Sequence, residues 1–303
     1  IMIQIEKRGH YMSVSKVKTT IVKQKIRNPI LNVLAHVYAY LLFLIYVIPV
    51  ALVVLFSFTD SATIASKHLT LSSFTLDNYI SIFQKASSYK PFVVSIAYSA
   101  IAASFVAIIV LIACRILQKR NDRLGGALEY GLLIPWLLPT TLMALGLITT
   151  YNTPRIWMFN KVLTGTSVIM LIGYIIIKIP FTLRMTKAAF FSLDDSLEDA
   201  ARNMGAKPFY TFMRVQLPII LPTVLAIFAL NFNGLLGDYD MSVFMYHPLN
   251  KPLGVYIKSL TDAETNADNA ALTFVYAVLM MIISAAVMYL VYGRGNKVDK
   301  SKD

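Results

Sequence analysis

The sequence predicts an all-α membrane protein with six transmembrane helices, a cytoplasmic loop that contains two short helices, and both termini in the cytoplasm. Of its 303 residues, 57% are apolar and 15% are charged, whereas ordinary soluble chains carry about 25% charged residues. The charged residues lie between long apolar stretches instead of being spread evenly. Basic residues are also concentrated in alternate connections between those stretches.

Six apolar stretches are each long enough to cross a bilayer. A hydrocarbon core of roughly 30 Å needs about 20 helical residues. Backbone polar groups inside lipid must be paired within their own segment, which favours helices over strands at this length. The stretches contain a single charged residue, Lys178. The predicted spans are residues 34–58, 92–114, 130–150, 166–183, 218–236 and 271–292.

The distribution of Lys and Arg predicts the orientation, because short loops rich in these residues stay in the cytoplasm. Segments 1–33, 115–129, 184–217 and 293–303 hold 20 of the 28 basic residues, and connections 59–91, 151–165 and 237–270 hold seven. We therefore expect a basic cytoplasmic lead-in at 1–33, a six-span domain at 34–292 and a basic cytoplasmic tail at 293–303. This distribution also accounts for the net charge of +12, so nucleic acid is not an expected partner, whereas membrane lipid is.

The beginning of the chain is unusual, since Ile1 precedes Met2 and Met12. We expect either a trimmed start or one part of a longer polypeptide. A cleaved signal peptide is not expected, because its apolar region would be about 7 to 15 residues long, and the run at 34–58 is longer.

Several chemistries lack the residue spacing that they need. The phosphate-binding pattern GxxxxGK[ST] and the zinc pattern HExxH do not occur, and the four histidines are scattered. Cys114 is the only cysteine, so it cannot form an internal disulfide. Asp238 and Asp240 are the best candidates for paired catalytic carboxylates, but they share one stretch after the fifth span. The sequence therefore predicts no catalytic residues, no cofactor and no metal site, and it assigns any ATP hydrolysis to another subunit.

The most informative stretch is the loop at 192–218. Ser192 is expected to cap a helix, with Asp195 three residues later, and Gly205 is expected to end it. Pro208 suits the first turn of a second helix, and Pro218 is expected to open the fifth span. The first helix carries an apolar stripe at helical spacing, formed by Leu197, Ala200, Ala201 and Met204.

The stripe has two interpretations: a docking surface for another protein, or an amphipathic helix lying on the membrane. The acidic residues before it, Glu198 among them, would be repelled by an anionic leaflet, which favours docking. Small side chains at Ala200 and Ala201 would let a partner approach closely.

This loop resembles the EAA loop of permease subunits from binding-protein-dependent bacterial ABC importers. The family pattern is E-A-A, three residues, G, nine residues and I-x-L-P. Here the matching positions are Asp199, Ala200, Ala201, Gly205, Val215, Leu217 and Pro218. Asp199 replaces the usual Glu, although Glu198 is adjacent, and Val215 replaces Ile. With the six-span layout, the resemblance covers residues 34–292.

The resemblance implies a permease subunit of the bacterial cytoplasmic membrane. Its loop would insert into a separate cytoplasmic ABC ATPase, present in two copies. A second permease unit, identical, homologous or fused, would complete the pathway, and an extracytoplasmic binding protein would deliver the solute. The residues expected to couple to the ATPase are Leu197, Glu198, Asp199, Ala200, Ala201, Met204, Gly205, Pro208, Leu217 and Pro218.

The third, fourth and fifth spans carry most of the helix breakers and polar residues, so we expect them to line the path. The candidate path residues are Pro139, Pro180, Asn231, Asn233 and Asp238. The two asparagines suit either path lining or hydrogen bonds between helices. Lys178 suits either a path role or an extended side chain that reaches the cytoplasmic interface, the latter being favoured by its short distance from Arg184.

Residues 73–79 and the overall layout are similar to permeases of the ferric iron, polyamine and phosphonate group. Ferric iron is the preferred expectation, because the Ile1 start would suit the second half of a fused iron-type permease; polyamine and phosphonate remain alternatives. A different class, a secondary transporter driven by an ion gradient, would require inverted repeats and buried ionisable residues near mid-membrane.

Overall fold

The computed structural model describes residues 28–66, 68–120, 122–154, 156, 160–194, 196–262 and 269–292. Most of the predicted lead-in, the predicted tail at 293–303 and Asp195 therefore lie outside the described residues. The chain divides into two units, Ile1–Ala51 and Leu52–Asp303, and each is considered by itself.

The described part of the first unit is helical. Helix α2 (Pro29–Ser57) begins there, and the Asn28 carboxamide oxygen accepts a hydrogen bond of 3.0 Å from the Ile30 backbone N–H. Residues 29–51 are exposed apart from the half-buried Leu42. A uniformly apolar helix of this length, exposed on all sides, matches the predicted first span.

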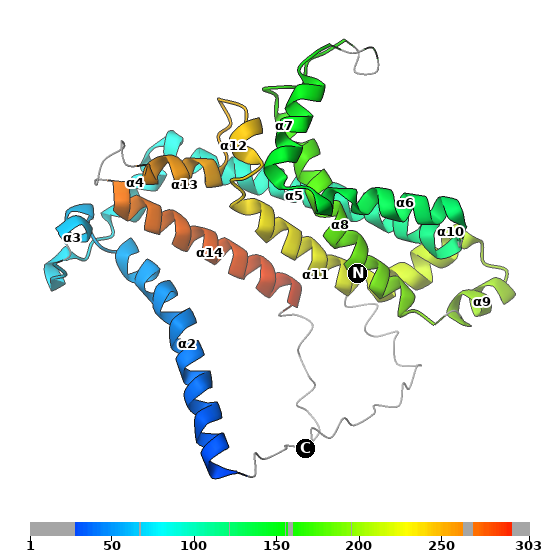
Figure 1. Ribbon diagram of the computed structural model, residues 1–303, viewed down its shortest axis with the longest axis horizontal. Helices are drawn as coiled ribbons and strands as arrows, with labels where there is room; N and C mark the ends of the chain where they lie inside the picture. Colours follow the sequence, from blue (N-terminus) through cyan, green and yellow to red (C-terminus); the bar gives the residue numbers. More distant parts are fainter. Residues whose placement is uncertain are drawn as a thin grey trace. The chain divides into compact units, whose positions relative to one another are not determined.

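Three long helices form the centre of the second unit: α5 (Ala86–Lys119), α8 (Ser167–Phe191) and α11 (Leu217–Leu236). Helix α14 (Ala270–Tyr292) runs beside α11, as Figure 1 shows. Ala102 and Ala103 of α5 are completely buried, and small residues at such positions let membrane helices approach closely.

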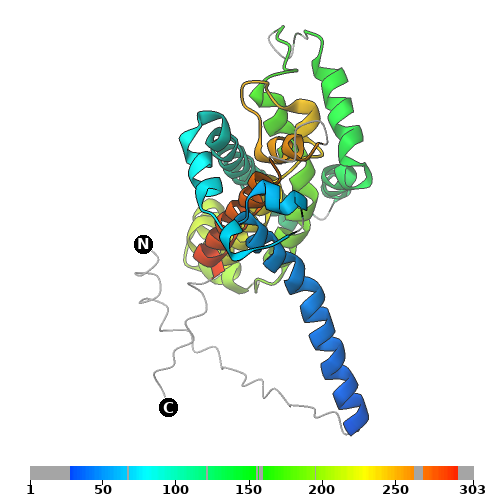
Figure 2. The same cartoon turned by 90° about the vertical axis from the view of Figure 1, so that its left-hand side faces the viewer.

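The third span is broken, which corrects the expectation of one continuous helix at 130–150. Helix α6 (Arg123–Leu133) leads into a 3₁₀ turn, η3 (Ile134–Leu137), and α7 (Thr140–Tyr151) follows. The two segments meet at 108°, and Figure 2 shows α7 turning away from α6. Pro135 and Pro139 explain the break, because proline cannot donate to the helical hydrogen-bond ladder.

The other predicted spans agree with single helices, although several helices extend beyond the predicted ends. Five helices are long and apolar enough to cross a membrane, and the bent pair supplies a sixth when it is taken as one span. These counts refer to the described ranges. The fold is that of an all-helical, multi-pass membrane protein.

Short helices cap the ends of the spans. They are α3 (Ser61–Ser66), η2 (Leu71–Ser73), α4 (Asp77–Gln84), α12 (Ser242–Met245) and α13 (Leu253–Thr261). The stretch at 73–79 fixes one of these connections: the Asn78 side-chain amide donates to the Thr59 carbonyl at 2.9 Å, and the Tyr79 and Ser57 hydroxyls lie 2.7 Å apart. This stretch therefore has a structural role in the connection.

Candidate coupling loop and transport path

The loop at 192–218 begins differently from the expectation. Helix α8 continues to Phe191, so Ser192 is the C-terminal cap of α8 and its hydroxyl donates to the Ala189 carbonyl at 2.8 Å. The next helix, α9 (Ser196–Asn203), is capped by Asp194, whose carboxylate accepts from the Ser196 backbone N–H at 2.9 Å. That hydrogen bond lowers the pKa of the Asp194 carboxyl.

Gly205 ends α9 as predicted. Its φ is +81°, a left-handed conformation that favours glycine. The Ala206 N–H donates to the Ala201 carbonyl at 3.0 Å, and the Gly205 N–H donates to the Arg202 carbonyl at 2.9 Å. These two bonds form the Schellman motif, so the end of α9 is a defined turn.

The second part of the loop continues directly into the fifth span. Helix α10 (Pro208–Thr211) begins at Pro208 as predicted and passes through a π-helical turn, η5 (Phe212–Gln216), into α11. Together they form one helix of 29 residues, Pro208–Leu236. Leu217 and Pro218 therefore lie within a continuing helix, which corrects the expectation that Pro218 opens the span. The wider π turn directly precedes the proline, which lacks a backbone donor.

Glu198 is the centre of an ionic network that joins α9 to α5. Its two carboxylate oxygens accept from both guanidinium nitrogens of Arg115 at 3.1 and 3.2 Å. The Lys119 ammonium lies 3.2 Å from the same carboxylate, and the Gln216 side-chain amide of η5 donates to it at 3.0 Å. A bidentate guanidinium–carboxylate pair is geometrically specific, so α9 is held in a fixed position against α5 and η5.

The electrostatics of this network agree with its geometry. Hydrogen bonds from Arg115 lower the pKa of the Glu198 carboxyl from 4.5 to about 2, against the opposing effect of burial. The Arg115 guanidinium also lies 5.8 Å from the ring centre of Phe212, and that ring stacks on Phe190 of α8 at 6.3 Å. The network therefore connects the loop to two spans through ionic and aromatic contacts.

The other face of α9 is open. Met204 is 82% exposed, and Ala200 is exposed as well. Ala201, by contrast, is 4% exposed, so the expectation that it offers a surface to a partner is wrong. Its methyl group faces the chain's own packing because it lies on the same side of α9 as Glu198.

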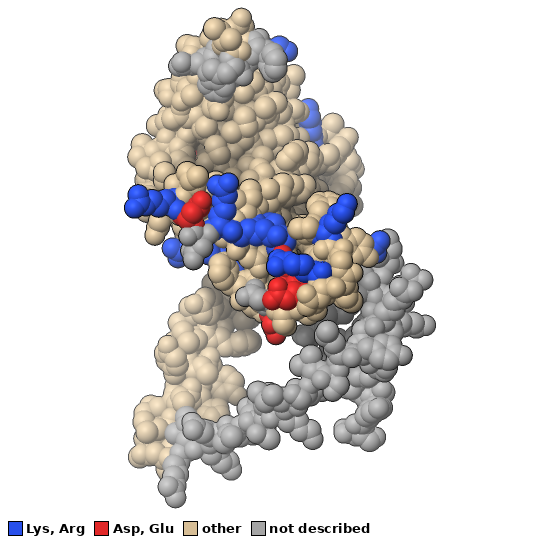
Figure 3. Space-filling view, turned by 90° about the vertical axis from the view of Figure 1, so that its right-hand side faces the viewer, with Lys and Arg blue, Asp and Glu red and all other residues tan. Residues whose placement is uncertain are grey.

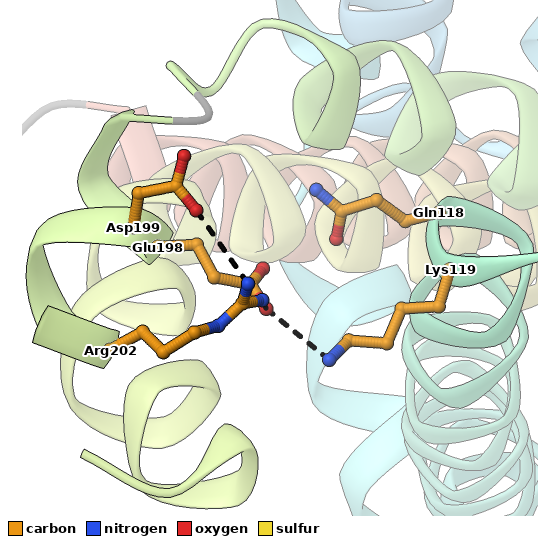
Figure 4. Close-up of a pocket in the computed structure, with 5 residues that line it drawn as sticks. All are labelled: Gln118, Lys119, Glu198, Asp199 and Arg202. Carbon is orange, nitrogen blue, oxygen red and sulfur yellow. Dashed lines mark ion pairs between the residues drawn. The ribbon is translucent and has the colours of Figure 1, made fainter. Parts of the chain in front are cut away.

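Figure 4 shows this arrangement in close-up, with Glu198, Asp199 and Arg202 on α9 facing the end of α5. An open pocket of about 330 Å³ lies between them, lined by Gln118, Lys119, Glu198, Asp199 and Arg202. In Figure 3 Lys and Arg side chains form a band on this side of the molecule, with Asp and Glu beside them. The pocket is thus the cleft between the loop and the end of a span.

Polar residues along α8 face α11 in three successive turns. At one level the buried Asn231 side-chain amide donates to the Thr182 hydroxyl at 2.7 Å. At the next level the Lys178 ammonium lies beside Gly234, where an added Cβ would come within 2.8 Å of it. The third level, beyond the end of α11, is formed by Tyr174, Ser242 and Asp238.

At this third level the Tyr174 and Ser242 hydroxyls are 2.6 Å apart. The Asp238 carboxylate accepts from the Ser242 N–H at 3.1 Å and from its hydroxyl at 2.8 Å. Asp238 therefore caps the short helix α12 and is one of the groups that fix α12 to α8.

The candidate path residues thus differ in their surroundings. Asn231 makes the hydrogen bond between helices that was one of its two interpretations, and Pro180 is buried inside α8. Pro139 is exposed at the start of α7. Asn233 is half-buried, and its carboxamide oxygen has no hydrogen-bond partner among the residues that the structure describes.

Sequence reasoning missed several residues of these sites. Arg115 and Gln216 are far from Glu198 in sequence, and neither has a local signal that pairs it with that carboxylate. The residues on α8 did carry one, since Tyr174, Lys178 and Thr182 recur at every fourth position within the predicted span at 166–183, which places them on one face.

Two curated proteins are similar in sequence to this chain. The probable ABC transporter permease protein y4fN of Sinorhizobium fredii is 37% identical over 287 residues, which cover 94% of this chain and 50% of that protein. The chain therefore spans about half the length of this relative. The putative 2-aminoethylphosphonate transport system permease protein PhnV of Salmonella paratyphi A is 24% identical over 212 residues, covering 70% of this chain and 78% of that protein.

A solved structure shares the fold. It is the crystal structure of a bacterial ABC transporter involved in the import of the acidic polysaccharide alginate, and it matches with a TM-score of 0.69. The match covers 89% of this chain and 96% of the other at 16% identity.

The family assignment comes from residues 106–296, which match the family model described as "Binding-protein-dependent transport system inner membrane component". This range is more than half of the 303 residues and includes the whole coupling loop. The match and the apolar helices indicate a multi-pass protein of the bacterial inner membrane. The chain belongs to the family of inner membrane components of binding-protein-dependent transport systems.

Proposed function

We propose that the chain is the permease subunit of an ATP-driven importer and that α9 transmits the movement of a separate ATPase to the spans. The observation that carries this proposal is the two-sided character of α9. One side is tied to α5 and η5 through Glu198, while the other presents Ala200 and Met204. Because α9 is anchored to the spans on one side and exposed on the other, a partner that moves α9 would also move the spans.

The proposed partners follow from the family and the EAA resemblance. Two copies of a cytoplasmic ATPase supply the energy, because the sequence has no GxxxxGK[ST] pattern for nucleotide phosphates. A second permease unit, identical, homologous or fused, completes the path, and an extracytoplasmic binding protein delivers the solute. Both termini and the coupling loop are placed in the cytoplasm by the distribution of basic residues.

The proposed solute differs from the ferric iron that the sequence favoured. The iron expectation rested on the Ile1 start and on the similarity of the layout, and the two relatives' names give it no support: one names 2-aminoethylphosphonate and the other names no solute. We therefore replace iron with the phosphonate alternative. A small solute with an anionic group is the proposed cargo.

The coupling proposal is tested by co-purification. A tagged full-length chain is isolated in mild detergent from cells that express the neighbouring ATPase gene, and the recovered ATPase is measured. Met204→Asp adds a charge to the open face of α9 and should reduce the recovered ATPase strongly. Leu249→Asp is the matched control, because Leu249 is also well exposed, at 72%, but lies in the connection after α12.

Equal recovery of the ATPase with wild type and both variants would contradict the proposed contact. A wild-type chain that recovers no ATPase in the presence or absence of nucleotide would contradict the importer function itself.

A further inference from the structure

Lys178 is the charged residue of α8 that lies furthest from either end of the helix. Its ammonium reaches across to α11 at Gly234, two residues before that helix ends. Asp238 is the only charged group that interacts with it electrostatically among the described residues, and none of them pairs with or hydrogen-bonds the ammonium. The side chain is therefore directed at α11 and not at the end of α8 near Arg184, which argues against the interfacial reading.

The surroundings of the ammonium are open on one side. Gly234 is exposed and has no side chain to cover Lys178, while Lys178 and Asn233 are half-buried. An uncompensated charge facing lipid is costly, and charges inside spans therefore face the protein interior or a water-filled cavity. The exposed side of this site is accordingly a wet surface.

Rigid contacts surround the site on both sides. The Thr182–Asn231 hydrogen bond fixes α8 to α11 one turn away in one direction. In the other direction Asp238 is engaged by Ser242, which in turn contacts Tyr174. Since Asp238 is held by α12, it is not free to neutralise the ammonium by moving against it.

We propose that Lys178 is the contact point for an anionic group of the solute in the transport path. This inference rests on the proposed function and deepens it, because it names the charge of the cargo. An ammonium is a compact point charge with three rotatable donors, which suits a phosphonate, sulfate or carboxylate group arriving from different directions. A multivalent cation such as ferric iron would be repelled at the same place.

A structural role for Lys178 makes a different prediction. A positive charge near the last turn of α11 is stabilised by the negative end of that helix's dipole. In that role the free energy of unfolding falls when the charge is removed, but added anions need not change the labelling of the ammonium. The two roles are therefore separated by measuring whether an aqueous reagent reaches the ammonium and whether added anions protect it from that reagent.

The experiment labels the purified full chain, with and without a co-purified ATPase, with a water-soluble amine-directed reagent and quantifies Lys178 by mass spectrometry. Sodium salts of 2-aminoethylphosphonate and of sulfate are the probes, and putrescine is the cationic comparison. We expect one or both anions to slow labelling of Lys178 by about threefold at twice the dissociation constant. The exposed Lys207 of the coupling loop serves as the internal reference, and labelling of Lys178 is expressed relative to it, because 2-aminoethylphosphonate and putrescine carry primary amines that also consume the reagent.

Uptake by the assembled transporter gives the second readout. Lys178→Gln should reduce uptake of the protecting anion by about tenfold or more, the equivalent of 1.4 kcal/mol, and Lys178→Arg should retain most of it. Gly234→Ala tests the position of the charge without removing it, because the new methyl group would displace the flexible end of Lys178; uptake should fall while the chain still folds.

Three results would overturn the inference: no labelling of Lys178 by the aqueous reagent, equal labelling with and without both anions, or protection by putrescine alone. The failure of the proposed function is distinguishable, since it consists of the loss of ATPase co-purification in the wild type, whereas labelling and protection of Lys178 are measured on the permease chain itself.

Discussion

Replacing Glu198 with Gln isolates the ionic network that anchors the coupling loop. The amide keeps the size of the side chain but removes the charge that Arg115 and Lys119 share. The Glu198 and Arg115 side chains are 18% and 15% exposed, so both lose most of their contact with water. Two basic groups would therefore be left without their partner in a partly buried setting, which is the costly way to break an ion pair.

The expected loss of stability follows from the lowered pKa of the Glu198 carboxyl. A pKa of about 2 in place of 4.5 corresponds to roughly 3 kcal/mol of preference for the charged form. Glu198→Gln should therefore lower the free energy of unfolding by about 2 to 3 kcal/mol. The matched control is Asp199→Asn, whose exposed carboxylate has a 3.8 Å contact with Arg202 and should change stability by less than about 0.5 kcal/mol.

The assay is equilibrium unfolding in mixed detergent micelles, performed over a range of pH. Since the folded pKa is depressed, the contribution of Glu198 is fully present above pH 4.5 and is lost as pH falls toward 2. This part of the pH dependence should be absent in Glu198→Gln. If that variant were as stable as Asp199→Asn at neutral pH, or if its acid profile matched the wild type, the network would not anchor the loop.

Substitutions at three further positions test the fold. Gly205→Ala places a side chain at a φ of +81° and should cost about 1 kcal/mol of unfolding free energy, whereas Gly205→Asn should cost less. Asn231→Leu removes the buried hydrogen bond to Thr182 and should cost about 1 kcal/mol in the same assay, because the Thr182 hydroxyl then keeps only the bond that it donates to the Lys178 carbonyl. Gly254→Ala should be the most damaging, by roughly 3 kcal/mol or by loss of expression, because the new Cβ would lie 2.4 Å from the Asp238 backbone oxygen and that carbonyl cannot rotate away. Wild-type stability in any of these variants would contradict the corresponding contact.

Sequence alone was sufficient for features that depend on local chemistry. The apolar length of a bilayer span set the positions of five spans to within a few residues at most ends, and the glycine requirement of a helix end placed Gly205 correctly. The EAA spacing likewise identified the loop, because those residues are close together in the chain.

Features that depend on long-range packing could not be predicted from the sequence in the same way. The direction of Glu198 is decided by Arg115, which is 83 residues away, so α9 alone does not show which of two neighbouring carboxylates faces inward. The 108° break in the third span was signalled by Pro135 and Pro139, but an apolar run with prolines also suits a kinked single helix. Lys178 extends toward α11 because that helix lies opposite it. The sequence does not show this, since the same side chain is long enough to reach the membrane interface instead.

The continuity of the helix from Pro208 to Leu236 has a mechanical consequence. Its 29 residues span roughly 43 Å at 1.5 Å each, which exceeds the thickness of the hydrocarbon core. Because the coupling loop and the fifth span share one backbone, a displacement of the Pro208 end is carried into the span. A tilt of about 5° imposed at the Pro208 end would shift the Leu236 end by about 4 Å, comparable to the width of a small solute group. A small displacement of the loop is therefore geometrically sufficient to open or close the far end of the span.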